Sequence, residues 1–222
     1  MNMIKTRLKQ QKDNNTHLWK LLCSVSALFS AKVKGRVRFK ECLLIKSTIN
    51  AGDKSNTIIL DGGVLRNCRI IINGTNSTVY IGKNCVFNSL DIILYGDNSH
   101  CFIGDNVIFN SYKSAESGIN VGDNTKVEIG ADSLFSNGIG IYTTDFHKIF
   151  DCTGAQINNN KSVTIGKHVW VGMKSMILKG SMIPDGCVVG AGTIISGEVK
   201  EKNAICVGSA SNIVRKDIQW EK

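Results

Sequence analysis

One histidine stands among residues that could make it a base. His147 belongs to the segment TTDFHKIFD, residues 143–151, which places a carboxylate on either side of it. A neutral imidazole suits general-base catalysis near pH 7, and Asp145 or Asp151 could orient its second nitrogen. The simpler interpretation is a loop histidine that hydrogen-bonds to the backbone.

Other reactive groups are weaker candidates. Cys152 follows His147 by five residues and could form a covalent intermediate as a thiolate, although an inert loop cysteine is the simpler interpretation. The spacing of His100, His147 and His168 does not favour a zinc site. The eight cysteines are scattered and form no CxxC pair. We therefore expect no metal and no disulfide framework, and a reduced, cytoplasmic protein.

A six-residue repeat indicates the scaffold that must position these groups. From Ile165 an aliphatic residue recurs every six positions, and a small or short side chain often follows four residues later. A helical period of 3.6 cannot keep such a stripe on one face, whereas short strands separated by turns can. The positions expected to point inward are Ile165, Val171, Ile177, Ile183, Val189, Ile195, Val207 and Ile213.

The repeat is interrupted after Ile141. Its phase requires the next coil at residue 147, but the regular hexads resume at Ile165, so eighteen residues are interposed. A solenoid accepts such an insertion only as an excursion from its surface, and function tends to concentrate in such loops. We therefore expect a loop over residues 143–162 that carries the chemistry of His147.

The repeat resembles that of the hexapeptide-repeat acyltransferases. The resemblance covers about residues 100–216 and is dense in the segments IGKHVWVG (165–172), ILKG (177–180), IPDG (183–186) and VGAGTI (189–194). It implies an all-β fold, a left-handed parallel β-helix in which three hexads form one triangular coil. The left hand comes from the resemblance alone.

Within that family the chain is most similar to capsule and lipopolysaccharide sugar O-acetyltransferases. The similarity lies in the Asp-x-His motif that ends at His147 and in the Trp-Val-Gly motif that begins at Trp170. It implies that His147 deprotonates a sugar hydroxyl, which attacks acetyl-CoA directly. It also implies that Trp170 lines the acetyl and acceptor site and that Asp145 completes the catalytic set. The expected acceptor is a bacterial surface polysaccharide.

The resemblance also assigns contacts with acetyl-CoA, which in this family lies in a groove between two β-helices. The family's Thr-Lys reads Ser196-Gly197 here, and its Gly-Asn-Pro-Ala reads GSAS at 208–211. The lost lysine leaves Lys200, Lys202, Arg215 or Lys216 to meet the CoA phosphates. The cofactor positions carried over are Met173, Ala191, Gly192, Ser196, Gly197 and Arg215.

Because a groove between β-helices needs a second one, the resemblance implies a homotrimer with shared sites. Two alternative functions remain open. One is N-acetylation of an amino-sugar nucleotide, since a single base suits an amine as well as a hydroxyl. The other is a non-catalytic β-helix scaffold. The combination of His147 and Trp170 favours catalysis, and nucleic acid is not an expected partner.

The net charge of +9 is confined to the N-terminal segment. Residues 1–46 hold eleven Lys or Arg against two acidic residues, while the rest of the chain is neutral. Such a segment could meet an anionic glycan or the inner membrane face, or simply be a solvated surface. Residues 21–31 are too short to span a bilayer, so we expect peripheral association at most.

Helical spacing of apolar residues predicts one amphipathic helix over residues 16–30. The expected organisation is therefore a basic segment with this helix over 1–44, the β-helix over 45–216, and a tail over 217–222.

Overall fold

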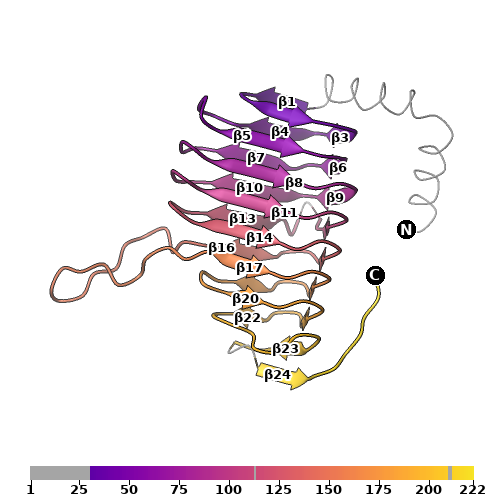
Figure 1. The fold of residues 1–222 in the computed structure, drawn as a ribbon, viewed down its shortest axis with the longest axis vertical. Helices are drawn as coiled ribbons and strands as arrows, with labels where there is room; N and C mark the ends of the chain where they lie inside the picture. The colour runs from indigo at the N-terminus through magenta and orange to yellow at the C-terminus, as the bar shows by residue number, and fades with distance from the viewer. Residues whose placement is uncertain (1–30, 113, 210–211) are drawn as a thin grey trace.

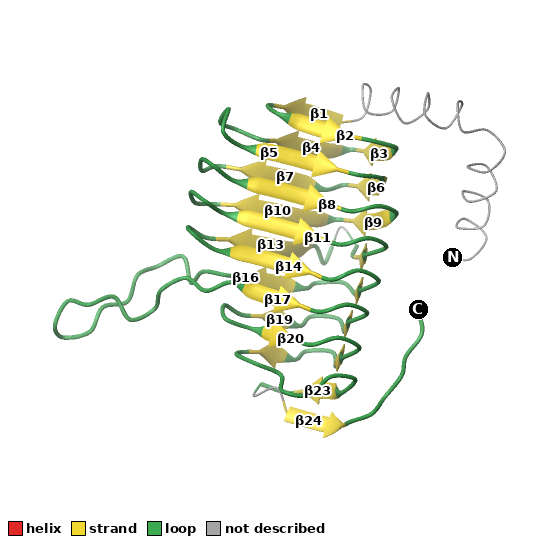
Figure 2. Ribbon diagram, in the orientation of Figure 1, coloured by secondary structure: helices red, strands yellow, loops and turns green. Residues whose placement is uncertain are grey.

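The computed structural model describes residues 31–112, 114–209 and 212–222, and this part of the chain is a parallel β-solenoid (Figures 1 and 2). Each full coil passes from sheet A to sheet B to sheet C, and strands of successive coils pair in parallel. The described residues contain no α-helix, and therefore none able to cross a bilayer. The all-β solenoid is confirmed, whereas the helix predicted over 16–30 lies outside the described residues.

The three sheets form the faces of a triangular prism. Sheet A contains β1 (Ala31–Lys34), β4 (Ser47–Asn50), β7 (Arg69–Ile72), β10 (Leu90–Leu94), β13 (Ser117–Val121), β16 (Gly140–Tyr142), β19 (Met176–Ile177) and β22 (Ile194–Ile195). Sheet B contains β2 (Val37–Phe39), β5 (Thr57–Leu60), β8 (Thr78–Ile81), β11 (His100–Ile103), β14 (Lys126–Ile129), β17 (Val163–Ile165) and β20 (Met182–Ile183). Sheet C contains β3 (Cys42–Ile45), β6 (Gly63–Arg66), β9 (Cys85–Asn88), β12 (Ile108–Asn110), β15 (Leu134–Phe135), β18 (Trp170–Val171), β21 (Val188–Val189), β23 (Ile205–Val207) and β24 (Asn212–Arg215).

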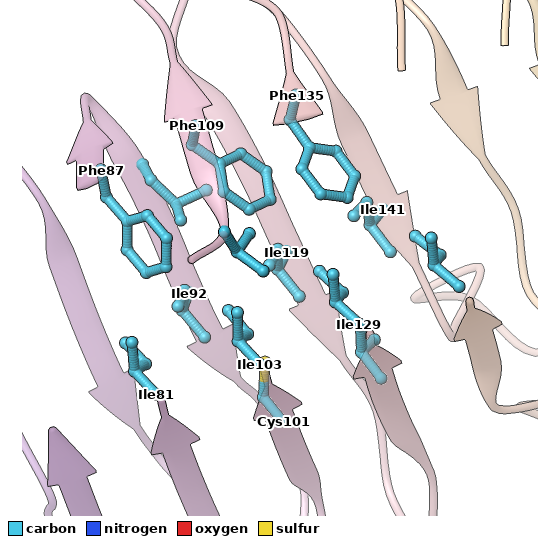
Figure 3. Packing of buried hydrophobic residues seen from close by; sticks show 14 of the residues in the cluster. Ile81, Phe87, Ile92, Cys101, Ile103, Phe109, Ile119, Ile129, Phe135 and Ile141 are labelled. Carbon is cyan, nitrogen blue, oxygen red and sulfur yellow. The ribbon is translucent and has the colours of Figure 1, made fainter. Parts of the chain in front are cut away.

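The interior of the prism is filled by the inward side chains of all three sheets. The aliphatic positions predicted from Ile165 to Ile195 are all buried, which confirms the hexad interpretation there. Phe87, Phe109 and Phe135 follow one another on the inner face of sheet C, with ring centroids 5.4 and 4.2 Å apart (Figure 3). Each coil therefore packs mainly against the coils next to it, as in other solenoids.

Two boundaries differ from the sequence-based expectation. β1 and β2 precede residue 45, so the described part of the solenoid already includes residues 31–44; charged residues at alternate positions of this first coil obscured its pattern. At the other end, Val189 pairs with Cys206, which is buried, while Val207 is only half-buried. The prediction that Val207 points inward is wrong because this coil is one residue shorter than three hexads.

The tail over 217–222 folds back along the edge between sheets B and C. The amide of Ile218 donates to the carbonyl of Asn203 (2.9 Å), and Lys222 Nζ donates to the carbonyl of Asn106 (2.7 Å). The tail therefore spans several coils and reaches the edge beside β18.

Candidate functional site

Residues 143–162 leave the solenoid between β16 and β17 as a long arm (Figure 1). Its two halves run side by side. The amide of Lys161 donates to the carbonyl of Thr143 (3.0 Å), and the amide of Ile157 donates to that of Ile149 (2.9 Å). The protruding loop expected from the interrupted repeat is thus confirmed, and it is a hydrogen-bonded arm.

Two side chains fix the base of the arm. Asn158 Nδ2 donates to the Asp145 carboxylate (2.9 Å) and to the carbonyl of His147 (2.7 Å). Lys179, between β19 and β20, donates to the same carboxylate and to the carbonyl of Asn158 (2.8 Å). Sequence reasoning missed both residues, since they lie 13 and 34 positions from Asp145 and no motif links them to it.

The Asp145 carboxylate therefore stabilises the base of the arm and does not contact the imidazole of His147. The hydrogen bond from Lys179, followed by that from Asn158, lowers the pKa of the Asp145 carboxyl. Asp151 is also engaged elsewhere, because it accepts hydrogen bonds from Thr153 and from the amide of Ala155. The structure thus differs from the expected contact between a carboxylate and the His147 ring. Asp145 reaches His147 only through the backbone and through Asn158.

The position of His147 is set by a strained turn. Phe146 has a φ of +63°, a conformation that bulky residues rarely adopt. The amide of His147 donates to the carbonyl of Asp145 (2.7 Å) around it, which is the rare, strained form of γ-turn. Strain of this kind gathers at functional sites. His147 itself is exposed, so a substrate can reach its imidazole.

Trp170 lies on the outer face of sheet C, where its side chain is 39% exposed. Trp220 of the tail is its aromatic neighbour, with ring centroids 6.0 Å apart. Trp220 stacks on His168 at 4.0 Å and donates its indole N–H to the carbonyl of that residue (3.0 Å). The tail thus lies beside Trp170 and leaves part of the indole accessible.

The predicted cofactor positions fall on three parts of the surface. Met173, Ala191 and Gly192 share the edge between sheets C and A, where the amide of Gly192 donates to the carbonyl of Met173 (2.8 Å). Ser196 and Gly197 lie on the edge between sheets A and B, beneath the root of the arm. Arg215 lies in β24, which pairs antiparallel with β23 at the end of sheet C.

A single chain does not bring all the predicted catalytic residues together. The arm that carries His147 leaves the solenoid at the edge between sheets A and B, and that edge is opposite the face formed by sheet C (Figure 1). Trp170 lies on sheet C. The body of the solenoid therefore stands between Trp170 and the root of its own arm, although the arm projects outward toward open space.

Known proteins are similar to this chain in its repeat and in overall sequence. Residues 162–196 match the family described as hexapeptide repeat of succinyl-transferase. The polysialic acid O-acetyltransferase of Neisseria meningitidis is 35% identical over 144 residues, which cover 57% of this chain and 67% of that protein. The putative lipopolysaccharide biosynthesis O-acetyl transferase WbbJ of Escherichia coli K12 is 28% identical over 118 residues, 47% of this chain and 59% of that protein.

Solved structures extend the likeness to most of the fold. The structure of the polysialic acid O-acetyltransferase OatWY matches with a TM-score of 0.59 and 28% identity, covering 87% of this chain and 92% of that one. The polySia-specific acetyltransferase NeuO matches with a TM-score of 0.56 at 22% identity, covering 87% of this chain and 88% of that one, a likeness of fold.

Proposed function

Because the chain belongs to the hexapeptide-repeat acyltransferases, we propose that it acetylates a hydroxyl of a bacterial surface polysaccharide, with acetyl-CoA as the donor. Its membership of the family follows from its 35% identity to a sugar O-acetyltransferase, together with the matching repeat and fold. The observation that carries this proposal is an exposed histidine on a braced arm, in a chain related to an enzyme named for polysialic acid. The support for a glycan acceptor is the name of that relative and of the lipopolysaccharide enzyme.

His147 is the proposed general base. Its imidazole takes the proton of the acceptor hydroxyl as the oxygen attacks the thioester carbonyl of acetyl-CoA. Collapse of the tetrahedral adduct breaks the C–S bond, and the imidazolium returns the proton to the departing CoA thiolate. This sequence regenerates the neutral imidazole and needs no covalent enzyme intermediate. The accessible imidazole and the strained turn that directs it support this role.

We further propose that the site forms between chains of a homotrimer. The arm leaves from the edge opposite sheet C, so the Trp170 that a given His147 meets belongs to a second copy. The arm also exposes Ile149, Phe150 and Ile157, which are 53%, 55% and 62% accessible. Apolar side chains on a projecting segment suit burial against another chain.

The proposed acetyl-CoA groove follows the edge between sheets C and A. Small residues there allow the cofactor to approach the backbone, and a Cβ added at Gly192 would meet no atom within 4 Å. Trp170 lies on the adjoining face and would wall the acetyl end. Ser196 and Gly197, on a different edge, would serve the cofactor from the partner's side of a shared groove.

The basic first coil supports a further proposal, about where the enzyme acts. Its side chains Lys32, Lys34, Arg36, Arg38 and Lys40 are all exposed. We propose that they draw the enzyme, in the cytoplasm, toward an anionic acceptor or the inner membrane face. Attraction of this kind acts over about 8 Å at physiological salt and weakens as salt rises.

The first test is His147→Ala, assayed with acetyl-CoA and a panel of bacterial capsule and lipopolysaccharide glycans by mass spectrometry. Transfer should fall by about a hundredfold or more if the general base is lost. His100→Ala is the matched control, because His100 belongs to β11 of sheet B, two strands from β17, and is not part of the arm. Wild-type turnover by His147→Ala at saturating acetyl-CoA would remove His147 from the chemistry.

A further inference from the structure

A groove of about 540 Å³ crosses the outer face of sheet A beside the base of the arm. Glu116 and Lys174 border it at the edge between sheets C and A, and Tyr95 and Tyr142 border it at the edge from which the arm leaves. Its volume lies within the range of pockets that hold small ligands. None of the catalytic or cofactor-binding residues predicted from the sequence lines this groove.

Two glycines form the floor of the groove. Gly118 in β13 pairs with Gly140 in β16, and the same row continues to Asp91 on one side and Met176 on the other. Because outward positions of a strand normally carry side chains, two adjacent glycines leave a depression between larger neighbours. A Cβ added at Gly140 would lie 2.5 Å from the Tyr142 ring, so that ring rests over the glycine.

The walls offer polar groups of both signs and aromatic surface. Arg69 Nε donates to Asp91 (2.9 Å), and a second guanidinium nitrogen pairs with the same carboxylate. Asn120 follows in the next row, paired with Tyr142. Planar carboxylate, guanidinium and amide groups are suited to paired hydroxyls, since each offers two donor or acceptor positions. Tyrosine rings provide flat apolar surface for a C–H face.

The groove is continuous with the segment that holds His147. The ring of Phe146 meets Tyr95 edge to face at 5.3 Å and Tyr142 at 6.3 Å. Tyr142 ends β16, and the arm begins at the next residue. The two tyrosines that wall the groove therefore also contact the strained residue directly before His147.

From this arrangement we infer that the groove binds a pyranose ring of the acceptor glycan. That this ring belongs to the acceptor rests on the proposed function. Tyr95 and Tyr142 stack on its C–H face, while Asp91 and Asn120 bond its hydroxyls. The two cations and two carboxylates of the lining balance, and Arg69 is already paired with Asp91. The groove thus recognises the polyhydroxylated ring rather than a charge.

The test measures sugar binding without acetyl transfer. Saturation-transfer NMR of the full chain would use methyl β-galactopyranoside as a neutral probe and methyl α-N-acetylneuraminide as an anionic probe. We expect saturation of the ring protons of both probes, and a signal at the protein-free level in Tyr95→Ala. Tyr80→Ala is the matched control, because Tyr80 is an outward tyrosine of sheet B and should leave the signal unchanged.

A second variant separates loss of binding from loss of folding. Gly118→Val adds a strand-favouring side chain to the floor, and its Cβ would meet only the Asn120 amide, at 3.3 Å. It should keep the thermal midpoint of the wild type and abolish the signal. Absence of saturation from both probes, or equal signals in wild type, Tyr95→Ala and Gly118→Val, would overturn the inference.

The outcome also distinguishes this inference from the proposed function. Acetylation of a glycan with an acceptor KM unchanged by Gly118→Val would refute the groove and leave the activity standing. Sugar binding that depends on Tyr95 and Gly118, without acetylation of any glycan tested, would refute the activity and leave the groove standing as a sugar site.

Discussion

At the scale of single residues, the orientation of His147 comes from its own backbone. The strained turn at Phe146 and the contact of Asn158 with the His147 carbonyl fix the main chain, while Asp145 is held by Lys179. The proposed base, His147, therefore depends on the geometry of the turn more than on a carboxylate partner. Phe146 is therefore a positioning residue whose ring and backbone act together.

Phe146→Gly separates those two contributions. Glycine adopts a positive φ without strain, so the turn itself should survive, but the contacts with Tyr95 and Tyr142 are lost. We expect kcat to fall by about tenfold through misplacement of the base, with the KM for acetyl-CoA unchanged. Steady-state kinetics checks this split. A purely structural residue would instead lower the thermal midpoint and leave kcat of the folded fraction intact.

Cys152 tests the covalent alternative at the same scale. It is exposed on the arm, whereas Cys68, Cys85 and Cys101 are buried and burial raises their pKa to about 12. Direct transfer requires no thiolate, so Cys152→Ser should retain wild-type turnover. Intact-protein mass spectrometry with acetyl-CoA alone should detect no acetyl adduct that this substitution removes. A Cys152-dependent adduct that chases to acceptor would establish the covalent route instead.

At the scale of elements, the arm is tied to the solenoid by a few polar contacts and by the ring of Phe146. The ion pair between Lys179 and Asp145 joins the arm to the coil below it. Asp145 has a lowered pKa in the folded chain, so the anchor is fully present above the ordinary value of 3.8 and is lost as pH falls through the lower folded value. Arm anchoring should therefore be constant from neutral pH down to about pH 5.

Removing the cation should release the arm at neutral pH. Cys23 lies outside the described residues and is replaced by serine, so that a nitroxide label attaches to Cys152, the exposed cysteine of the described residues. In Lys179→Met, this label should report faster arm motion at pH 7 by electron paramagnetic resonance, and kcat should fall by about tenfold. Lys126→Met breaks another exposed ion pair, to Glu128, and is the control. Identical spectra for wild type and Lys179→Met would mean that the backbone pairing alone holds the arm.

The predictability of the elements follows coil length. Between Lys167 and Asp185 the coils span 18 residues, so the hexad phase reads directly from the sequence. Earlier coils are longer and unequal, with 22 residues between Arg69 and Asp91 and 26 between Asp97 and Asp123, because their corners hold extra residues such as the left-handed Asn67 and Asn76. The phase is lost at each such corner, and pattern alone cannot align those strands.

The same reason limits what could be predicted of the site. The interrupted repeat and the resemblance point to His147 and Trp170. They do not identify Lys179, or the sheet A groove with Tyr95 and Gly118, because these residues become neighbours of the arm only when coils of unequal length are stacked. Residues that point outward from the sheets also follow no apolar pattern. Their neighbours on adjacent strands therefore cannot be predicted until the register is known.

At the scale of the whole molecule, the solenoid separates two predicted catalytic residues. His147 stands on an arm from one edge of the prism and Trp170 on the opposite face. If both act in one reaction, the assembly rather than the chain is the catalytic unit. A cyclic trimer would repeat the same contact three times, the arm of each chain meeting sheet C of the next.

Subunit complementation tests this arrangement directly. His147→Ala and Trp170→Ala chains, each nearly inactive alone, would be unfolded together, refolded as a 1:1 mixture and assayed for transfer. If a site takes His147 from one chain and Trp170 from the next, about a quarter of the interfaces in randomly mixed trimers would hold both intact residues. Activity should therefore return to about a quarter of the wild-type level. The control is wild type refolded with chains that carry both substitutions, which measures the effect of diluting intact chains with inactive ones. If the mixture stays as inactive as its separate components, both residues act within one chain, and the arm must fold back around its own solenoid.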